Sequence, residues 1–388
     1  MRFLYIAPRY HTNQVPIIEG LIKDGHEVMF LSHYVRNMEN YNCITPIVVG
    51  YSPLSDLLLG IIGRIMRWSP EQLSHRKILC GFPSCHKLRK YIKDFQPDFA
   101  ILRERSVYTI FATRICKRLK IPAILYNQSP LWEEQIKNDI LHRLVRRLTP
   151  KRRITPVLGI ESTAKMMEPG ASFVPFVMPP LLSPEQKQYH SDGLLKILCI
   201  GKYEERKNHL MLIEAISELK NDSQIDIHLT ISGECTSKAH HHYLEKIEKT
   251  IADRKLNENI TLYKNLTREE IFREYQKADL FVIPSTLEPA SISQLEAMAH
   301  SLPVICSDTN GSASYYVEDG VNGYIFADNH KESLKEALSK VFENPAKIPV
   351  MGAAGYDIIA NKCCFQIYFD SIMEIAKDIN EKGASYDQ

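Results

Sequence analysis

Apolar and polar residues follow a repeating order of short strands and amphipathic helices along the chain. A strand expected over Phe3 to Ala7 is followed by apolar residues at helical spacing from Val15 to Ile22, and a second strand spans His26 to Ser32. The same order returns at 98–126 and is plainest from residue 195 onward. Strands that alternate with helices predict parallel, doubly wound sheets.

The second half of the chain carries the clearer pattern. Thr267 and Glu270 form a capping-box signature at the start of one of its helices. A proline-dense stretch at 169–184 lacks either period and predicts a linker between two domains. Strands are expected at 197–200, 227–232, 260–263, 280–283, 304–307 and 324–326.

Composition agrees with two globular domains. A chain of 388 residues with 44% hydrophobic residues is long enough to bury two cores. No stretch approaches the length of a membrane-spanning segment and the first residues lack a signal peptide, so a cytoplasmic location is expected. The nine cysteines show no Cys-x-x-Cys spacing, which predicts reduced thiols without a disulfide framework or a zinc site.

The charge is divided unevenly between the halves. Residues 1–180 hold 26 basic against 14 acidic residues, a net charge of +12, and the remainder holds 22 against 32, a net charge of −10. A basic half suits phosphate groups, an anionic membrane or nucleic acid, or it simply solvates a surface. No aromatic and basic sheet motif is present, and nucleic acid is therefore not expected as a partner.

The candidate chemistry lies between residues 280 and 326. A strand, a short loop and a helix beginning near Ser291 would place a helix N-terminus at the carboxyl edge of a parallel sheet, where an anion binds well. Glu288 in the loop and Glu296 in the helix would bracket one crevice and suit sugar hydroxyls. Taken singly, either glutamate is more often an ordinary surface charge.

Two segments resemble a known family. Glu288 and Glu296 have seven residues between them within P-S-T-L-E-P-A-S-I-S-Q-L-E-A-M-A-H-S-L-P-V, which resembles the donor-site signature of retaining glycosyltransferase family 4, in glycosyl transferases group 1. About 80 residues upstream, I-G-K-Y-E-E-R-K-N at 200–208 looks like the family's strand-Gly-Arg…Lys-Gly turn. The resemblance is strong over roughly 195–340 and weak before it.

The resemblance implies an α/β protein of the GT-B fold, with two Rossmann-like, doubly wound domains facing a cleft. Residues 1–180 would bind the acceptor, 181–362 the nucleotide-sugar donor, and a helix in 363–388 would return to the first domain. Lys207 would hold the donor diphosphate together with Lys202, Glu296 the ribose, and Glu288 the transferred sugar. The implied catalytic residues are Lys207, Lys202 and Glu288, and the implied donor contacts add Gly201, Ser291, Ile292, Ser293 and Glu296.

The sequence departs from the family pattern at four places. Lys202 replaces the usual arginine, and Ala290 with Ser291 replaces an aromatic residue and glycine. Ser301 replaces the glycine before Pro-Val, and Ser314 an acidic residue. The change at Ser291 matters most, because a Cβ there is expected to hinder close approach of a phosphate.

Three polar residues of the first half are candidates for acceptor or cleft contacts. His11 and Asn13 follow the first strand, where the family has a glycine-rich loop, and Asn127 follows the strand at Ile124 to Tyr126. The alternative is that they are solvated loop residues.

The implied reaction transfers a sugar from a nucleotide donor, a UDP-sugar, to a glycan or lipid-linked acceptor with retention of configuration, in cell-surface polysaccharide biosynthesis. No metal or cofactor is expected, and the run His240 to His242 is not expected to bind a metal, because consecutive helical residues point in different directions. A non-catalytic nucleotide-sugar or phosphate-binding GT-B module is the alternative. A dehydrogenase is disfavoured by the absence of Gly-x-Gly-x-x-Gly after a strand.

Two amphipathic segments make an anionic membrane surface a candidate partner, with a peripheral position on its inner face. In 56–68 apolar residues and Trp68 cover a wide helical face, and in 136–148 an apolar stripe from Ile136 to Leu148 lies opposite Lys137 and several arginines. The alternative is that both helices pack on the first sheet. The basic residues expected at the membrane are Arg143, Arg146, Arg147, Lys151, Arg152 and Arg153.

Overall fold

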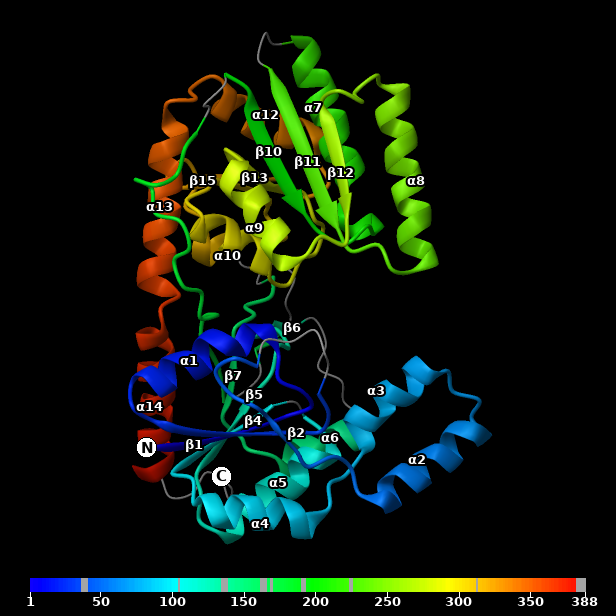
Figure 1. Ribbon diagram of the computed structural model, residues 1–388, viewed down its shortest axis with the longest axis vertical. Coiled ribbons are helices and arrows are strands. Elements are labelled where there is room, and N and C mark those ends of the chain that lie inside the picture. The colour runs from blue at the N-terminus through cyan, green and yellow to red at the C-terminus, as the bar shows by residue number, and fades with distance from the viewer. Residues whose placement is uncertain are drawn as a thin grey trace. The chain divides into compact units, whose positions relative to one another are not determined.

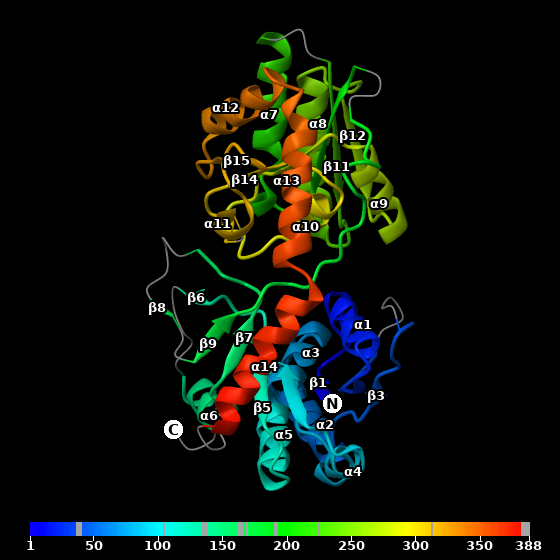
Figure 2. The same cartoon turned by 90° about the vertical axis from the view of Figure 1, so that its left-hand side faces the viewer.

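The computed structural model describes residues 1–35, 41–103, 105–133, 139–160, 166–167, 170–189, 193–222, 226–311 and 313–381. The chain divides into two compact units. Unit 1 comprises Met1–Pro156, Lys165–Val177 and Phe365–Gln388, and unit 2 comprises Val157–Ala164 and Met178–Cys364. Figure 1 and Figure 2 show a sheet flanked by helices in each unit.

Unit 1 contains a seven-stranded sheet whose strands are all parallel and lie in the order β3-β2-β1-β4-β5-β7-β9. Two short strands, β6 and β8, pair antiparallel outside it. The strands are β1 (Arg2–Ala7), β2 (Glu27–Ser32), β3 (Ile47–Val48), β4 (Phe99–Arg103), β5 (Ala123–Tyr126), β6 (Trp132–Glu133), β7 (Arg153–Thr155), β8 (Met166–Met167) and β9 (Ala171–Phe173). The helices are η1 (Thr12–Gln14), α1 (Val15–Lys23), α2 (Pro53–Ile65), α3 (Pro70–Cys80), α4 (Cys85–Phe95), α5 (Val107–Arg118), α6 (Ile140–Leu148) and α14 (Phe365–Glu381).

Alternating side chains of β1 build two cores in this unit. Phe3 and Tyr5 pack with α1 and α14. The hydroxyl groups of Tyr5 and Tyr368 of α14 form a hydrogen bond of 3.1 Å. Leu4 and Ile6 point to the other face and pack against α4 and α5. The sheet is therefore covered on both faces, and α14, the last described helix, covers the sheet of the first unit, as expected from the sequence.

Unit 2 contains a six-stranded parallel sheet in the order β12-β11-β10-β13-β14-β15. Helices α7 and α8 lie side by side on one face of it (Figure 1). The strands are β10 (Leu195–Ile200), β11 (Ile227–Gly233), β12 (Ile260–Lys264), β13 (Leu280–Ile283), β14 (Val304–Ser307) and β15 (Gly323–Phe326). The helices are η3 (Glu205–Lys207), α7 (His209–Asp222), α8 (Lys238–Asp253), α9 (Arg268–Lys277), α10 (Ile292–Ala299), α11 (Ala313–Tyr316), α12 (Lys331–Phe342) and α13 (Lys347–Lys362).

The expected linker at 169–184 is partly wrong. Ala171–Phe173 forms β9 and pairs with β7 as the outermost strand of the first sheet. An edge position tolerates the short strand and the prolines that follow it, because only one side of the strand carries ladder hydrogen bonds. The stretch that lacks regular structure begins after Phe173.

Candidate functional site

The candidate site of unit 2 lies where the strand order reverses. β10 and β13 are neighbours in the middle of the sheet, although β11 and β12 separate them in the chain. Because both strands run in the same direction, the loops that follow them start at the same edge. Such a switch point at the carboxyl edge is where doubly wound sheets bind their ligands.

The N-terminus of α10 is fixed at this edge. Ser291 is the N-cap residue, and its hydroxyl accepts the amide of Gln294 at 3.2 Å. The hydroxyl of Ser293 reaches the carbonyl of Ile200 at 3.5 Å, which ties the first turn of α10 to the end of β10. The first-turn amides and the positive end of the helix dipole at Ile292 and Ser293 can bind an anion here.

Glu288 forms the centre of an ion-pair group at the same edge. Its carboxylate accepts Nη1 of Arg206 at 2.8 Å and also pairs with Nζ of Lys207. The side chain of Glu288 is 8% exposed and that of Lys207 13%, so the pair is shielded from water and salt. Two cations face one carboxylate, which leaves a net positive charge beside α10. Arg206 was not among the site residues expected from the sequence, although it adjoins Lys207 in the same loop.

The backbone around Glu288 holds the carboxylate in place. Leu287 adopts a left-handed conformation with φ 46°, and Glu288 forms a β-bridge with Asn310. The carbonyl of Glu288 also accepts the amide of Gly311 at 2.7 Å. On the facing loop, the carbonyl of Arg206 accepts the amide of Thr286 at 2.9 Å, so the two loops that carry the ion-pair group are joined by main-chain bonds.

Gly201 allows Lys207 to lie close to the end of β10. A Cβ at Gly201 would come within 3.0 Å of Cδ of Lys207, a distance at which the lysine stem would have to shift. Lys202 has a different partner, because its Nζ lies 3.2 Å from Glu234 Oε2 and both side chains are about half exposed. The structure thus joins Lys207 and Glu288 directly, while Lys202 pairs at the end of β11.

Glu296 lies one turn into α10 and contacts α9. The hydroxyl of Tyr275 is 3.2 Å from Glu296 Oε2 and 3.0 Å from the carbonyl of Ser293. Burial raises the pKa of the Glu296 carboxyl, an effect that the charge of Arg268 and the Tyr275 hydroxyl partly offset. The ring of His300 stacks on Tyr275 at 5.0 Å. A half-shielded carboxylate with a defined neighbour is suited to binding a pair of hydroxyl groups.

Two of the departures from the family pattern have local explanations. Ser291 has φ −115°, an extended conformation that any residue adopts, and its hydroxyl caps α10, so its backbone conformation does not require glycine. Ser301 has φ 59°, the left-handed region that favours glycine, and its hydroxyl donates to the carbonyl of Leu182 at 2.7 Å. It follows the end of α10, at the opposite end of the helix from Ser291. The side chain of Ser314 lies outside the described part of the structure.

Two of the three polar candidates of unit 1, His11 and Asn127, support local structure through their side chains. His11 caps η1, with its Nδ1 accepting the amide of Asn13 at 3.4 Å. The buried side chain of Asn127 accepts Nη1 of Arg153 at 2.9 Å. Both contacts lie at the carboxyl edge of the first sheet, after β1 and β5. The role of these residues toward an acceptor stays a prediction.

The basic residues expected at a membrane do not form one surface. Arg153 is 1% exposed and donates to Asn127 and to the carbonyls of Ser129 and Pro130. Arg152 pairs with Asp378 of α14. The expectation that Arg153 contacts lipid is therefore wrong, because its side chain is buried within unit 1, whereas the side chain of Arg152 is 35% exposed and its role at a membrane stays a prediction. Ile136 and Lys137, expected on the same amphipathic segment, lie outside the described residues.

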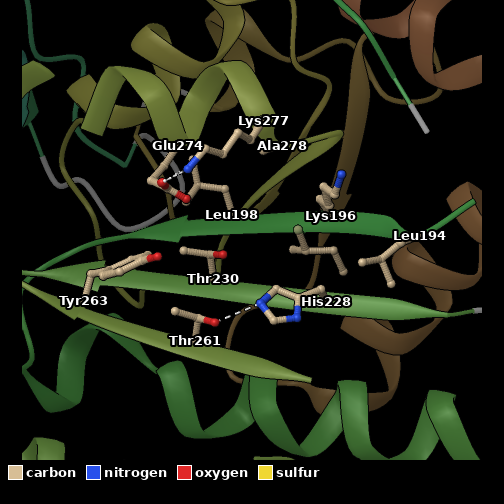
Figure 3. Close-up of a pocket in the computed structure, with 11 residues that line it drawn as sticks. Leu194, Lys196, Leu198, His228, Thr230, Thr261, Tyr263, Glu274, Lys277 and Ala278 are labelled. Atoms are coloured by element: carbon tan, nitrogen blue, oxygen red, sulfur yellow. Dashed lines mark hydrogen bonds and ion pairs between the residues drawn. The ribbon is translucent and has the colours of Figure 1, made fainter. Parts of the chain in front are cut away.

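A separate pocket of about 290 Å³ lies on the face of β10, β11 and β12 that α9 borders (Figure 3). Its lining includes His228, which is 2.9 Å from the hydroxyl of Thr261, and the ion pair of Glu274 with Lys277. None of the donor-site residues expected from the sequence lines it. The pocket is therefore distinct from the ion-pair group at the carboxyl edge.

Two further observations concern metals and membranes. Among the described residues, no group of three His, Cys, Asp or Glu side chains is arranged to hold a metal ion. Within the same residues, no helix has the length and apolar character needed to cross a bilayer.

The fold is that of solved glycosyltransferase structures. Residues 184–357 match the family described as Glycosyl transferases group 1, and this part of the chain belongs to that family. The chain is similar to a glycosyltransferase of Rickettsia africae (TM-score 0.69, 14% identity, covering 98% of this chain and 99% of that one). It is also similar to Alr3699/HepE of Anabaena in complex with UDP (TM-score 0.67, 12% identity, covering 97% and 100%). These likenesses confirm the GT-B fold expected from the sequence.

Curated relatives match over shorter regions. D-inositol 3-phosphate glycosyltransferase of Pseudarthrobacter chlorophenolicus is 26% identical over 163 residues, 42% of this chain and 38% of that protein. A GDP-mannose-dependent alpha-(1-6)-phosphatidylinositol monomannoside mannosyltransferase of Mycolicibacterium smegmatis is 24% identical over 213 residues, 53% of this chain and 54% of that protein. The matched regions thus span between about two fifths and about half of these relatives.

Proposed function

We propose that this protein is a retaining glycosyltransferase that moves a sugar from a UDP-sugar to a glycan or lipid-linked acceptor in cell-surface polysaccharide biosynthesis. The observation that carries the proposal is the group formed by Arg206, Lys207 and Glu288 beside the N-terminus of α10, at the switch point of the second sheet. The complex of the similar Alr3699/HepE protein with UDP supports the choice of donor. Peripheral association with the inner face of an anionic membrane belongs to the same proposal.

The proposed roles follow from charge. When the bond between the anomeric carbon and the diphosphate oxygen breaks, negative charge develops on the leaving nucleoside diphosphate. Lys207, Arg206 and the first amides of α10 stabilise that charge, and such fixed electrostatic stabilisation is commonly the largest catalytic contribution. The acceptor hydroxyl forms the new bond to the same face of the sugar, and its proton passes to the departing phosphate oxygen.

The ion-pair group also explains how Glu288 becomes available to the donor. A diphosphate bound at α10 competes with Glu288 for Lys207, because both are anions within reach of one ammonium group. The carboxylate is then free to accept hydrogen bonds from hydroxyl groups of the transferred sugar, while Arg206 keeps its contact with Glu288. Glu296 accepts the ribose hydroxyls. The proposal requires no metal ion, since the two cations and the helix dipole supply the positive charge.

A two-stage experiment tests the function. Thermal-shift measurements against a panel of sugar nucleotides identify the donor, because a ligand that binds the folded state raises the melting temperature. Donor hydrolysis and transfer to oligosaccharide and lipid-linked acceptors are then measured with that donor. Stabilisation without hydrolysis or transfer to any acceptor would identify a non-catalytic nucleotide-sugar-binding module, and no stabilisation by any sugar nucleotide would contradict both readings.

A further inference from the structure

Helix α2 carries a wide apolar face that the rest of the described unit leaves uncovered. The exposed fractions on this face run from 42% for Ile62 to 74% for Ile65. By contrast, the described parts of α1 and α14 expose one large apolar residue each, Ile22 and Ile367. The apolar face of α2 consists of Leu54, Leu57, Leu58, Ile61, Ile62 and Ile65, whose spacing places them on one side of a helix.

The other side of α2 is packed, which fixes the direction of the apolar face. Ser55, Leu59 and Gly63 are buried. The hydroxyl of Ser55 accepts the amide of Phe82 at 3.1 Å. A Cβ at Gly63 would lie 3.3 Å from side-chain atoms of Leu73 and Trp68, so the packing there is already close. Figure 1 shows α2 and α3 as a helical pair at the margin of unit 1.

Positive charge borders the apolar face. Arg64 and Arg67 at the end of α2 and Arg76 on α3 are exposed. The guanidinium of Arg76 lies 5.6 Å from the centre of the Trp68 ring. The carboxylate of Asp56 is paired with Lys77 at 2.8 Å and so contributes little negative field. Residues 53–80 contain four Lys or Arg against two Asp or Glu, a net charge of +2.

We propose that the apolar face of α2 inserts into an anionic lipid bilayer and is the membrane-docking surface of this protein. The combination of a broad apolar face, a neighbouring tryptophan and a cationic border suits the headgroup region, where apolar side chains enter the lipid and arginines meet phosphates. A second copy is a poorer occupant, because a symmetric contact through this face would bring identical cationic borders together. Of the two amphipathic segments expected at a membrane, this inference keeps α2 and omits the basic segment around α6.

The inference deepens the proposed function, on which it rests for the reason why a membrane is needed. A transferase docked through α2 would hold unit 1 at the surface where a lipid-linked acceptor resides. The physical test of docking is independent of sugar transfer, so the failure of one is distinguishable from the failure of the other.

Vesicle sedimentation tests the surface. Wild-type protein is expected to pellet with vesicles of phosphatidylglycerol and phosphatidylcholine in equal parts, and to bind phosphatidylcholine alone about 10-fold more weakly. The triple variant Leu57→Gln/Ile61→Gln/Ile65→Gln changes only exposed residues and should reduce partitioning at least about 10-fold. The matched control is Ile140→Gln/Leu144→Gln on α6, whose side chains are 77% and 48% exposed, and it should pellet like wild type.

Fluorescence and salt separate insertion from surface attraction. In a Trp132→Phe background, Trp68 emission should shift to shorter wavelength with anionic vesicles and be quenched by brominated acyl chains. High salt should weaken binding without abolishing it, because screening acts on the arginines and not on the apolar contact. Circular dichroism and nucleotide-sugar binding that match wild type would show that the triple variant is folded with an intact donor site.

Two results would overturn the inference. Vesicle binding that is unchanged in the triple variant, or lost equally in the α6 control, would show that α2 is not the docking surface. A wild-type dimer in sedimentation velocity that the triple variant abolishes, without vesicle binding, would show that a second copy covers α2. If wild-type protein binds vesicles but no sugar nucleotide, the proposed function fails and the docking surface stands.

Discussion

Lys207 and Glu288 form a direct ion pair between the loop after β10 and the loop after β13, and Arg206 shares the same carboxylate at 2.8 Å. The pair spans 81 positions of sequence and joins the two segments that carry the family resemblance. Glu288 is 8% exposed and pairs with both cations, so their positions depend on its carboxylate. Removing either partner therefore alters the electrostatics of the whole edge.

Lys207→Ala is expected to reduce turnover far more than donor affinity. The leaving diphosphate carries more negative charge in the transition state than in the bound donor, so the loss of the ammonium group should lower kcat by about 100-fold or more. The dissociation constant for the nucleotide should change by less than about 10-fold, since Arg206 and the amides of α10 remain. Steady-state kinetics and calorimetry measure the two quantities.

Lys246→Ala is the matched control for this substitution. Its ammonium group pairs at the surface with Glu205, 2.7 Å away, on the same short helix that bears Lys207. Its kcat should equal that of wild type. A Lys207→Ala enzyme with a wild-type kcat would exclude the leaving-group role of Lys207.

Glu296→Gln is expected to weaken donor binding and to stabilise the fold. The loss of a charged acceptor for ribose hydroxyls should cost about 1.5–3 kcal/mol of binding free energy. Because burial raises the pKa of Glu296, the folded state binds the carboxyl proton more tightly than the unfolded state does. The free energy of unfolding therefore decreases as pH rises from the unfolded-state pKa of 4.5 through the higher pKa of the folded state. The amide removes that penalty, so the melting temperature at neutral pH should rise.

The same raised pKa predicts a pH dependence of binding. Donor affinity in the wild type should fall as pH decreases and Glu296 becomes protonated, whereas affinity in Glu296→Gln should vary less. Calorimetry with the nucleotide across mildly acidic to neutral pH measures both. Equal donor affinity of the wild type and Glu296→Gln at neutral pH would show that Glu296 does not bind the donor.

Retention of configuration is expected for the transferred sugar. The arrangement places Glu288 and the leaving-group cations at one edge, and the proposed front-face attack forms the new bond on the side from which the diphosphate departs. Proton nuclear magnetic resonance of the first product, recorded before mutarotation, reports the anomeric configuration. An inverted product would contradict the proposed mechanism while leaving donor binding unaffected.

His209→Phe is expected to make unit 2 less sensitive to acid. His209 is fully buried and packs against Tyr203 and Tyr243, and burial lowers its pKa to about 3, with the charge of Lys207 adding to the effect. The unfolded chain takes up a proton below pH 6.5, so stability is lost as pH falls from 6.5 toward 3. Between pH 7 and 5 this loss is about 2 kcal/mol, and the phenylalanine should abolish it.

Urea unfolding at the two pH values measures the difference. His33 in unit 1 is buried against Tyr108, and its pKa is also lowered to about 3, so part of the acid sensitivity should persist in the variant. His242→Phe on the exposed surface of α8 is the control and should behave like wild type. An acid sensitivity of His209→Phe identical to that of wild type would disprove the role assigned to burial of this ring.

The sequence predicted most accurately what depends on local pattern. Leu280–Ile283 and Val304–Ser307 are strands with the expected bounds, because continuous apolar runs between turn residues define buried parallel strands. The capping box of Thr267 with Glu270 and the start of α10 after Ser291 are also confirmed, since capping is decided within four residues of chain.

The pattern of apolar and polar residues could not predict contacts between distant segments of the chain. The bonds of Tyr275 to Glu296 and of Arg206 to Glu288 join residues 21 and 82 positions apart, and no periodicity indicates such a pairing. Charge counting likewise assigned Arg153 to the surface, because arginines are mostly exposed. In the structure its partners are one amide and two carbonyls that become neighbours only when β5 and β7 pair.

Substitutions at Asn127 can distinguish a structural role of this residue from a contact with the acceptor. Its side-chain oxygen, just after the end of β5, accepts a hydrogen bond from Nη1 of the buried Arg153, the first residue of β7, at 2.9 Å. Asn127→Ala leaves part of a buried guanidinium without its partner and should lower the free energy of unfolding by about 1–3 kcal/mol. Asn127→Asp should restore an acceptor to Arg153 and recover most of that loss, and Gln128→Ala, at the neighbouring position, serves as the control.

Thermal unfolding and transfer kinetics are measured on all three variants. If Asn127→Ala melts like wild type while KM for the acceptor rises, the residue binds the acceptor and its bond to Arg153 is incidental; if stability falls and the aspartate recovers it with normal KM, Asn127 serves the fold of unit 1.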